Sequence, residues 1–256
     1  MPTADLTFNL LDSTDSTNNY AMGKAYAGLA SHGEAYFTSC QTQGKGQRGR
    51  TWSSNPGENI ALSIVLIPKY LDISQQFQLS AAVALACYRF IKKYAGDETS
   101  IKWPNDIYWR DRKAAGILIE NALGSLETGK TGWKFSVVGI GINVNQTNFD
   151  PSIPNPVSLK QITGKDFNPE ELAKELQAEV LSFCKQCYPE QFINTLAQYN
   201  AALYKRNALV RLKKAGIVFE TTIKEVTETG CLHTSDIIDN HFQFGEIEWF
   251  LNDSEN

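Results

Sequence analysis

Hydrophobic positions along the first 200 residues recur with the periods of both strands and helices. Helical spacing of Leu79, Ala82, Val83, Ala86 and Phe90 predicts a long helix over residues 73–94. Two further helices are expected at 16–28, where a Ser/Thr/Asn cluster provides the cap, and at 170–188. Alternating or short apolar runs predict strands at residues 8–11, 34–40, 59–67, 100–103, 107–109, 115–121 and 135–145.

The pattern changes after about residue 204. We therefore expect two domains, a large one over residues 1–203 and a small all-β module over 204–256, folded as a little barrel. The segment 150–156, which contains three prolines, is expected to be a surface loop of the large domain. The module is predicted from short strand-like runs at 208–212, 217–226, 231–234 and 242–251.

The order of elements in the large domain is neither a strict alternation of strands and helices nor all-β. An α+β fold, a mixed sheet with helices packed on it, is the class that fits this order. The 256 residues suffice for a large core, since chains of this size bury roughly 70–75% of their unfolded surface.

Composition and charge exclude several classes of protein. With 42% hydrophobic and 20% charged residues, the chain is not disordered, collagen-like or a coiled coil. The net charge of −4 argues against a nucleic-acid coat, which binds by neutralising phosphates with basic side chains. The longest apolar runs, such as 64–68 and 81–87, are far shorter than the ~18 residues of a membrane span. We therefore expect neither nucleic acid nor a membrane among the partners.

Cysteine usage and the first residues favour a cytoplasmic location. Residues 1–10 contain no basic stretch followed by an apolar run, as a secretory signal would. An odd number of cysteines, five, at wide spacing favours reduced thiols. Cys184 and Cys187 have CxxC spacing, but no second pair accompanies them, so two half-buried thiols fit better than a zinc or redox site. The histidines lie outside the motifs described next, which argues against a His-based triad.

A glycine-rich basic loop over residues 41–50 is the first candidate binding element. Its sequence GKGQRG at 44–49 matches GxGxxG, but turns and a strand follow instead of a helix, so the dinucleotide-binding interpretation fails. Lys45, Arg48 and Arg50 add three positive charges. Bare N–H groups and guanidinium forks suit a phosphate or a carboxylate. A solvated surface loop is the alternative.

Two lysines near a carboxylate form the second candidate. Lys102 ends a predicted strand, Asp106 lies in the turn beyond it, and Lys113 follows seven residues later. This spacing predicts a hairpin in which the two lysines lie close together on adjacent strands. Together they could neutralise a carboxylate and a phosphate in contact, which carboxylate activation by ATP requires, while Asp106 serves Mg²⁺ or orients Lys102. A surface hairpin with scattered charge is the alternative.

Gly139 and Gly141 alternate with β-branched residues in the last predicted strand of the large domain. Glycine weakens a strand, so it usually marks the close approach of a ligand or of another backbone. Asn143 would then present its amide to that ligand. Tight packing of the sheet explains the glycines about equally well.

Taken together, these segments resemble the biotin protein ligases, also called biotin–acetyl-CoA-carboxylase ligases. The resemblance spans residues 13–145, and it implies a class II synthetase-like catalytic domain with a small SH3-like barrel at the C-terminal end. Bifunctional members carry an N-terminal winged helix-turn-helix ahead of these motifs, and we expect this chain to lack it. The motifs, in order, are Ser16-Thr17-Asn18, Gln41 with GKGQRGR at 44–50 and Trp52, KWPND at 102–106, Lys113 with Ala115-Gly116, and GIGIN at 139–143.

The resemblance implies a two-step reaction. The carboxylate of biotin attacks the α-phosphorus of Mg·ATP, giving biotinyl-5′-AMP and pyrophosphate. A lysine of a biotin carboxyl carrier domain then attacks the mixed anhydride, giving the biotinyl amide and AMP. Biotin, ATP with Mg²⁺, and the carrier domain are therefore the expected partners. Members of the family can dimerise through sheet edges, and the sequence leaves a homodimer open.

Site residues carry over from the resemblance position by position. Lys113, Lys102 and Asp106 would be catalytic, with Asp106 as the metal ligand. Hydroxyl and amide groups can pair a ureido ring fully, which its burial requires, and a loop that closes would protect a hydrolysable adenylate. The expected biotin-binding residues are Ser16, Thr17, Asn18, Gln41, Gly44, Lys45, Gly46, Gln47, Lys113 and Gly116. Those expected for ATP or the adenylate are Lys45, Arg48, Arg50, Trp52, Lys102, Asn105, Lys113 and Asn143.

Two loop positions depart from the family pattern GRGRxGR, because Lys45 and Gln47 replace arginines. Lys45 keeps the charge without the guanidinium fork, and Gln47 keeps only an amide, which leaves open how tightly the loop retains an adenylate. A lipoate–protein ligase and a non-catalytic biotin-sensing module are the alternatives. The KWPND and GIGIN motifs favour the biotin branch, and the presence of both Lys102 and Lys113 argues against a sensor.

Overall fold

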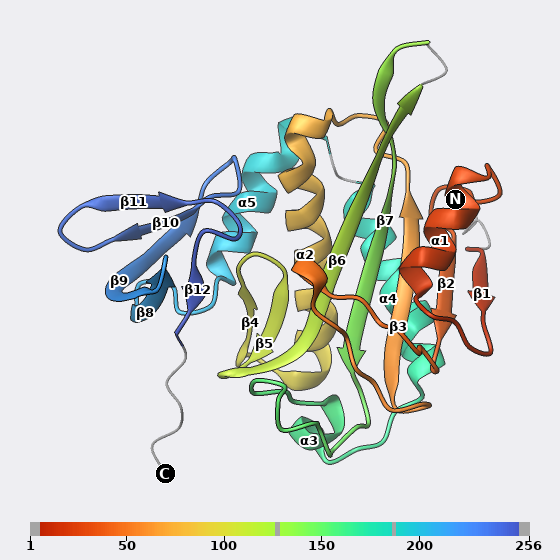
Figure 1. Ribbon diagram of the computed structural model, residues 1–256, viewed down its shortest axis with the longest axis horizontal. Coiled ribbons are helices and arrows are strands. Elements are labelled where there is room, and N and C mark those ends of the chain that lie inside the picture. Colours follow the sequence, from red (N-terminus) through yellow and green to blue (C-terminus); the bar gives the residue numbers. More distant parts are fainter. Residues whose placement is uncertain (1–5, 126–128, 186–187, 251–256) are drawn as a thin grey trace.

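A seven-stranded mixed sheet forms the centre of the chain in the computed structural model, which describes residues 6–125, 129–185 and 188–250 (Figure 1). The strand order is β1-β2-β3-β7-β6-β5-β4. Only the β1–β2 pair is parallel, and every other neighbouring pair is antiparallel. The strands are β1 (Phe8–Leu10), β2 (Ala35–Thr38), β3 (Asn59–Leu66), β4 (Thr99–Lys102), β5 (Asp106–Trp109), β6 (Arg112–Ser125) and β7 (Thr131–Asn143).

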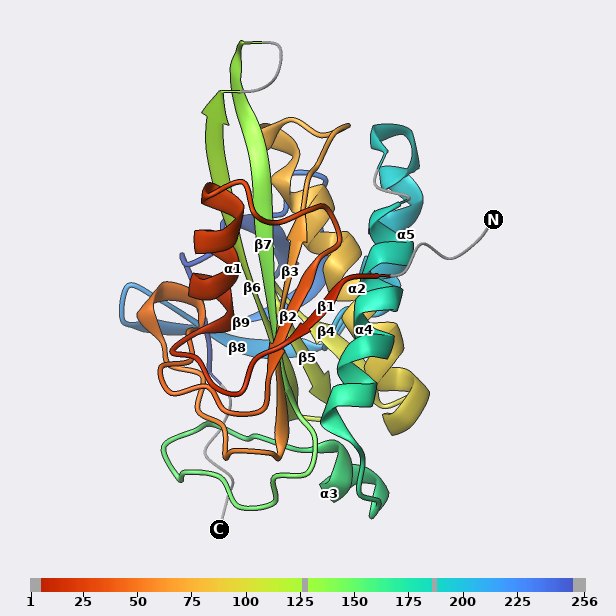
Figure 2. The same ribbon diagram turned by 90° about the vertical axis from the view of Figure 1, so that its right-hand side faces the viewer.

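Helices lie on both faces of this sheet (Figure 2). α1 (Thr17–Tyr26) covers one face, and α2 (Gln76–Ala95), α4 (Pro169–Cys184) and α5 (Phe192–Ala201) cover the other. The remaining helical turns are α3 (Leu159–Thr163), η1 (Gln47–Gly49), η2 (Ile73–Gln75) and η3 (Pro189–Gln191).

The two central strands show why the site forms on the α1 face. Side chains alternate between the faces of a sheet. One face of β3 and β7 packs into the core beneath α2 and α4 through residues such as Leu62 and Ile140, whereas Val65 and Val137 pack on the other face against α1. On this α1 face the same strands also present Ala61, Ser63, Gly139 and Gly141. Small residues at these positions leave a hollow between the sheet and α1.

The predicted helices and strands of the large domain are confirmed, apart from three differences among the helices. The expected helix over 73–94 begins as the short turn η2, capped by Asp72, before α2 starts. Helix α5 was not predicted; of its ten residues Phe192, Tyr199 and Asn200 are buried. The predicted helix over 170–188 ends earlier, at Cys184, and Cys187 lies outside the described residues.

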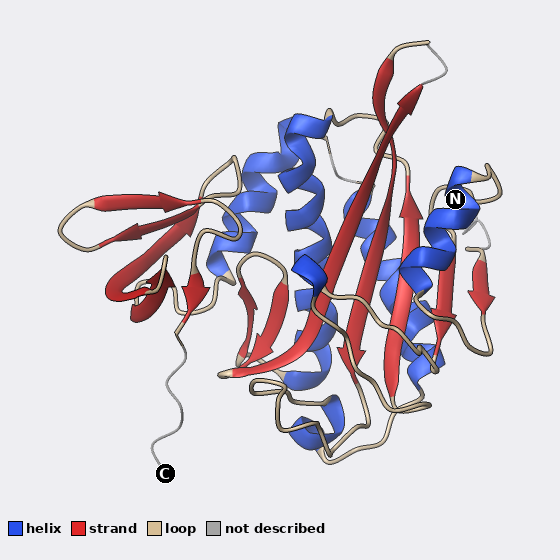
Figure 3. Cartoon of the chain, viewed as in Figure 1, coloured by secondary structure: helices blue, strands red, loops and turns tan. Residues whose placement is uncertain are grey.

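A second, smaller antiparallel sheet follows in the order β11-β10-β9-β8-β12 (Figure 3). The predicted strand over 242–251 is wrong: β11 ends at Phe242, and a turn through Gly245 (φ +90°) separates it from β12. Within the described residues β11 and β12 are free edges, so the sheet is not closed into a barrel. Its strands are β8 (Leu209–Lys214), β9 (Ile217–Val226), β10 (Leu232–Ser235), β11 (Asp239–Phe242) and β12 (Glu248–Trp249).

The α+β class, a mixed sheet with helices plus a small C-terminal β sheet, is thus confirmed. The division at residues 203/204 stays a prediction. In the described ranges, no helix is both long and apolar enough to cross a membrane.

Candidate functional site

A small cavity of about 50 Å³ lies on the α1 face of the sheet. A cavity of this size holds about one or two water molecules, and the glycine-rich loop contributes Lys45, Gly46 and Gln47 to its lining. Gly139, Ile140 and Gly141 of β7 form the floor. Eleven residues predicted from sequence also line it: Ser16, Thr17, Asn18, Gln41, Lys45, Gly46, Gln47, Trp52, Asn105, Lys113 and Gly116.

The first turn of α1 forms one wall of the cavity. Ser16 is the N-cap of the helix, and its side chain accepts a hydrogen bond from the backbone N–H of Asn19. Gln41 Oε1 accepts from the backbone N of Thr17 at 2.9 Å and from Thr17 Oγ1 at 3.3 Å. Gln41 therefore connects the first turn of α1 to the glycine-rich loop. Thr17 and Gln41 were both predicted to bind biotin, and the structure brings them together.

Asn18 is held by two residues that sequence reasoning missed. Its Nδ2 donates to Glu120 Oε2 at 2.9 Å, and its Oδ1 accepts from Ser63 Oγ at 2.6 Å. Ser63 is fully buried and also lies 2.8 Å from Thr17 Oγ1. A Cβ at Gly139 would collide with the Asn18 amide, which explains glycine there. The sequence held no local signal for this cluster, because Ser63 and Asn18 are 45 residues apart.

The glycine-rich loop is a closed hairpin anchored on both sides. Gly46 N donates to Arg50 O at 2.7 Å, within a loop whose single turn of 3₁₀ helix contains Arg48 in the left-handed conformation (φ 56°). Lys45 Nζ contacts Asn19 Oδ1 of α1 at 2.6 Å, and Arg48 Nη1 donates to Gly245 O of the small sheet at 3.1 Å. The loop therefore stands ordered over the cavity.

Trp52 fills part of the hollow made by the glycines. Its indole lies against Gly141, where an added Cβ would overlap the ring, and against Gly116. Trp52 Nε1 and Gln47 Oε1 are buried and have no hydrogen-bond partner within the described residues. A polar ligand that enters beside them could pair both atoms. Gly44 also lacks room for a Cβ, which would meet the Trp52 carbonyl and the Gln41 amide.

Lys113 reaches the site through an irregularity in β6. The register of β5 and β6 shifts at this point: Ile107 pairs with Ala115, and Tyr108 then pairs with Lys113, which leaves Ala114 as an extra residue. Such a bulge interrupts the alternation of side chains along the strand. The Lys113 side chain therefore lies on the same face as Gly116, next to it. Its Nζ forms an ion pair with Asp106 Oδ1 at 2.7 Å.

Lys102 and Lys113 do not lie on adjacent strands, contrary to the sequence prediction. Lys102 ends β4 and Lys113 lies in β6, with β5 between them. Asp106 of β5 lies between them, because it pairs with Lys102 in the backbone register and forms the ion pair with Lys113. The hairpin of the prediction is in fact a three-stranded edge.

Lys102 is buried, with 8% of its surface exposed. Its Nζ donates to Tyr108 Oη at 2.9 Å. Burial lowers the pKa of Lys102 to about 8; Asp106 acts in the opposite direction, and the charges of Lys113 and Arg50 lower the pKa further. Lys102 and Lys113 both neighbour the single carboxylate of Asp106, and this excess of positive charge suits an anion.

Asn143 and Asn105 hold the backbone around these charges. Asn143 Nδ2 donates to the carbonyls of Lys113 and Val157, both at 3.2 Å. Asn105 Nδ2 donates to Ile117 O at 2.6 Å. Asn143 therefore fixes the Lys113 backbone and does not line the cavity.

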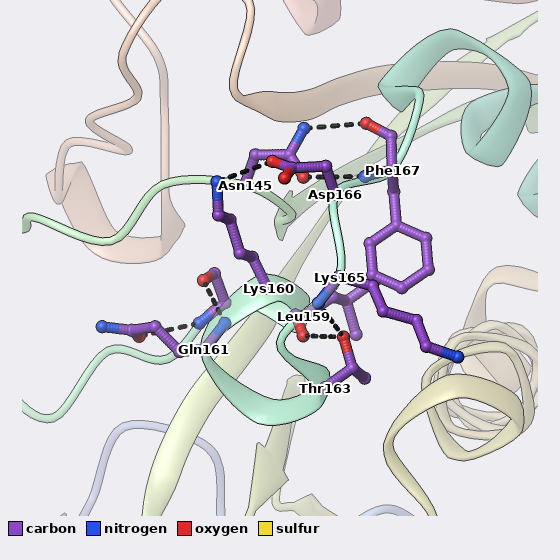
Figure 4. Close-up of polar contacts among 9 residues, drawn as sticks. Asn145, Leu159, Lys160, Gln161, Thr163, Lys165, Asp166 and Phe167 are labelled. Atoms are coloured by element: carbon purple, nitrogen blue, oxygen red, sulfur yellow. Dashed lines mark hydrogen bonds and ion pairs between the residues drawn. The ribbon is translucent and has the colours of Figure 1, made fainter.

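The segment after β7 supports Lys113 from outside. Lys113 N donates to Asn155 O at 2.7 Å, so the predicted surface loop lies along the start of β6. Figure 4 shows how its far end is fixed. Asn145 exchanges two hydrogen bonds with the Phe167 backbone, at 2.8 and 3.0 Å, and Lys160 pairs with Asp166 at 2.6 Å.

The residues present fit a magnesium ion carried by a nucleotide. In the described part of the chain, no group of three or more His, Cys, Asp or Glu residues could hold a metal ion. Mg²⁺ is commonly bound by one or two carboxylates together with substrate phosphates. Asp106 could supply one such carboxylate.

Not all predicted residues line the same cavity. Gly44, Arg48 and Arg50 line a neighbouring groove on the outer side of the loop, together with Glu120. Lys102, Asp106 and Asn143 line neither the cavity nor this groove. Besides Ser63 and Glu120, the prediction missed Tyr108 and Trp249, whose rings lie 4.5 and 5.4 Å from Lys102 Nζ.

Comparisons with known proteins agree with this arrangement. The bifunctional ligase/repressor BirA of Escherichia coli (strain K12) is 35% identical over 146 residues, which are 55% of this chain and 41% of that protein. The biotin–[acetyl-CoA-carboxylase] ligase of Paracoccus denitrificans is 37% identical over 169 residues, 63% of this chain and 66% of that protein. The match thus spans about two fifths of the length of the E. coli relative.

A solved structure extends the similarity over almost the whole fold. The biotin protein ligase from Aquifex aeolicus in complex with biotin and ATP superposes with a TM-score of 0.77 at 25% identity, covering 94% of this chain and 97% of that one. Residues 10–136 match the model of the biotin/lipoate A/B protein ligase family. Residues 10–136 therefore form a domain of the biotin/lipoate A/B protein ligase family.

Proposed function

We propose that this protein is a biotin protein ligase that forms biotinyl-5′-AMP from biotin and Mg·ATP. The biotinyl group then passes to a lysine of a biotin carboxyl carrier domain. The observation that carries the proposal is the position of the cavity, which lies between a wall of hydroxyls and amides and a cluster of cations. This arrangement suits a ligand with a polar ring at one end and a carboxylate at the other.

In this proposal, the α1 wall binds the ureido ring. Ser16, Thr17, Asn18 and Gln41 offer donors and acceptors in a buried place, where an unpaired polar group is costly. The floor glycines let the ligand lie flat on β7. Lys45, Gly46 and Gln47 close over it from the loop, and Gly44 shapes the loop.

The cation cluster serves the chemical step. Lys113 binds the carboxylate of biotin and later the adenylate, while Lys102 and Arg50 face the phosphates, with Arg48 nearby in the loop. The biotin oxygen forms a bond to the α-phosphorus and the bond to pyrophosphate breaks. Fixed positive charges stabilise the charge that develops in this transition state. Asp106 orients Lys113 and would hold the Mg²⁺ that accompanies the nucleotide, and Asn143 and Asn105 hold the backbone at this end.

The second step needs no covalent enzyme intermediate. The amine of the carrier lysine attacks the acyl carbon of the adenylate, an amide forms, and AMP leaves. Trp52 stacks near the adenine, and the ordered loop excludes water that would hydrolyse the anhydride. We also place this reaction in the cytoplasm.

Exchange of labelled pyrophosphate into ATP tests the proposal directly. We expect exchange that depends on biotin, and transfer of labelled biotin to a carrier domain. Exchange supported by lipoate alone would assign the protein to the lipoate ligases. A folded protein that binds biotin without any exchange would instead be a sensor, and the proposal would be wrong.

A further inference from the structure

The small C-terminal sheet contacts the candidate site at three points. Trp103, next to Lys102 in the chain, donates from Nε1 to Gly230 O at 2.9 Å. Arg48 of the glycine-rich loop donates to Gly245 O at 3.1 Å. The ring of Trp249 lies 5.4 Å from Lys102 Nζ. Figure 1 shows this sheet beside β4 and β5, the strands that end at the cation cluster.

The third contact belongs to an aromatic cluster that encloses Lys102. Tyr108 contacts the ammonium directly, and the ring of Tyr204 packs against Tyr108 at 5.3 Å and against Trp249 at 5.4 Å. Trp249 is the member that comes from the small sheet. A buried ammonium loses its hydration, and aromatic faces replace part of it through cation–π attraction.

The indole of Trp249 is held by contacts with other rings and not by a hydrogen bond. Its Nε1 is buried without a hydrogen-bond partner among the described residues. The indole therefore contributes shape and its π face. Removing it would open one side of Lys102 to water and free the side chain to rotate.

We propose that Trp249 is a positioning residue for Lys102, in addition to Tyr108, and that the C-terminal sheet thereby completes the nucleotide end of the site. The inference rests on the proposed function. Trp249 acts through Lys102 and not on biotin, whose ring is expected some distance away at the α1 wall. The effect of its loss should therefore fall on ATP.

Pyrophosphate exchange with ATP and biotin varied separately tests this assignment. Trp249→Ala should raise the KM for ATP roughly 10-fold, which is the effect expected when a desolvated cation–π contact is lost. The KM for biotin should stay within about twofold of the wild-type value. Trp249→Phe keeps an aromatic face and should recover most of the loss. Phe250→Ala is the matched control, because the neighbouring ring lies over Arg211, at 4.5 Å, and not over Lys102.

A double variant separates positioning from general loosening of the sheet. In a Lys102→Met background, Trp249→Ala should raise the KM for ATP no further. The inference would be overturned if Trp249→Ala raised the KM for ATP equally in the wild-type and Lys102→Met backgrounds. Equal rises in the KM for ATP and for biotin, or the same effect from Phe250→Ala, would overturn it too. Trp249→Leu preserves apolar volume if the alanine variant fails to fold, and an unchanged KM for ATP in that variant would overturn it as well.

The two proposals fail in different ways. A wild-type protein without exchange refutes the proposed function, and this inference with it. Wild-type exchange that Trp249→Ala leaves unchanged refutes only the role of Trp249.

Discussion

Lys113 and Asp106 form a 2.7 Å ion pair across β6 and β5, although the register places Lys113 opposite Tyr108 and Asp106 opposite Gly116. The extra residue Ala114 makes this diagonal contact available. Without it, the alternation of the strand would turn Lys113 to the other face of the sheet. The reactive end of the site therefore depends on one irregular residue in an otherwise regular strand.

Lys113→Ala should abolish most of the proposed adenylation. Removing one fixed charge at a developing anion commonly costs on the order of 100-fold or more in rate. Biotin-dependent pyrophosphate exchange measures this loss. Lys160→Ala, which removes a surface lysine paired with Asp166, should keep wild-type exchange, and equal exchange in the two variants would exclude Lys113 from the chemistry.

Ser63→Ala should weaken biotin binding without a large effect on ATP. The hydroxyl contacts both Thr17 and Asn18, and loss of a buried hydrogen bond leaves its partners unpaired, with an effect of about 10-fold on affinity. Isothermal titration with biotin measures it. The control Ser80→Ala changes a hydroxyl on α2 that bonds its own helix. An unchanged biotin affinity in Ser63→Ala would mean that the Thr17–Asn18 wall does not bind the ligand.

Gly141→Ala should disturb the seat of Trp52, because the new Cβ would overlap the indole. We expect slower exchange together with a change in Trp fluorescence. Gly124→Ala is the matched strand variant, since its Cβ would meet only the flexible Lys134 side chain, at 3.2 Å. If both variants behave alike, the glycine is there for general strand packing.

The affinity for ATP should fall as the pH rises through about 8. Burial lowers the pKa of Lys102 to about 8, so the side chain is charged below that pH and neutral above it. Lys102→Arg keeps its charge throughout and should flatten the dependence, even if its affinity is lower. The KM for ATP measured from pH 7 to pH 9.5 tests this, and a sloping profile in Lys102→Arg would assign the dependence to another group.

Arg48→Ala should shorten the time for which the loop retains the adenylate. The variant loses the hydrogen bond to Gly245 O. Loss of one such bond should make the glycine-rich loop open about 3-fold faster. Release of preformed biotinyl-5′-AMP measures it. Arg206→Ala removes a comparable bond, to Lys224 O, outside the loop. Equal release rates in the two variants would show that Arg48 does not anchor the loop.

Much of the fold was predictable because its signals are local. The helix α2 and the strands β3 and β7 carry periods that follow from the geometry of each element alone. The glycine-rich loop, the KWPND segment and the GIGIN strand were recognisable for the same reason, since each motif is a few residues long. The amino-acid sequence by itself thus determined the α+β class, the family resemblance and most of the residues around the cavity.

Tertiary structure decided what depends on contacts between distant segments. The bulge at Ala114 reflects the pairing of β5 with β6, and so the arrangement of Lys102 and Lys113 across three strands could not be inferred from spacing. Ser63 gained its place only when β3 packed under α1. Trp249 lies far from Lys102 in the sequence, yet its ring is 5.4 Å from Lys102 Nζ. Such contacts have no local period, because the free energy that fixes them comes from packing of the whole chain.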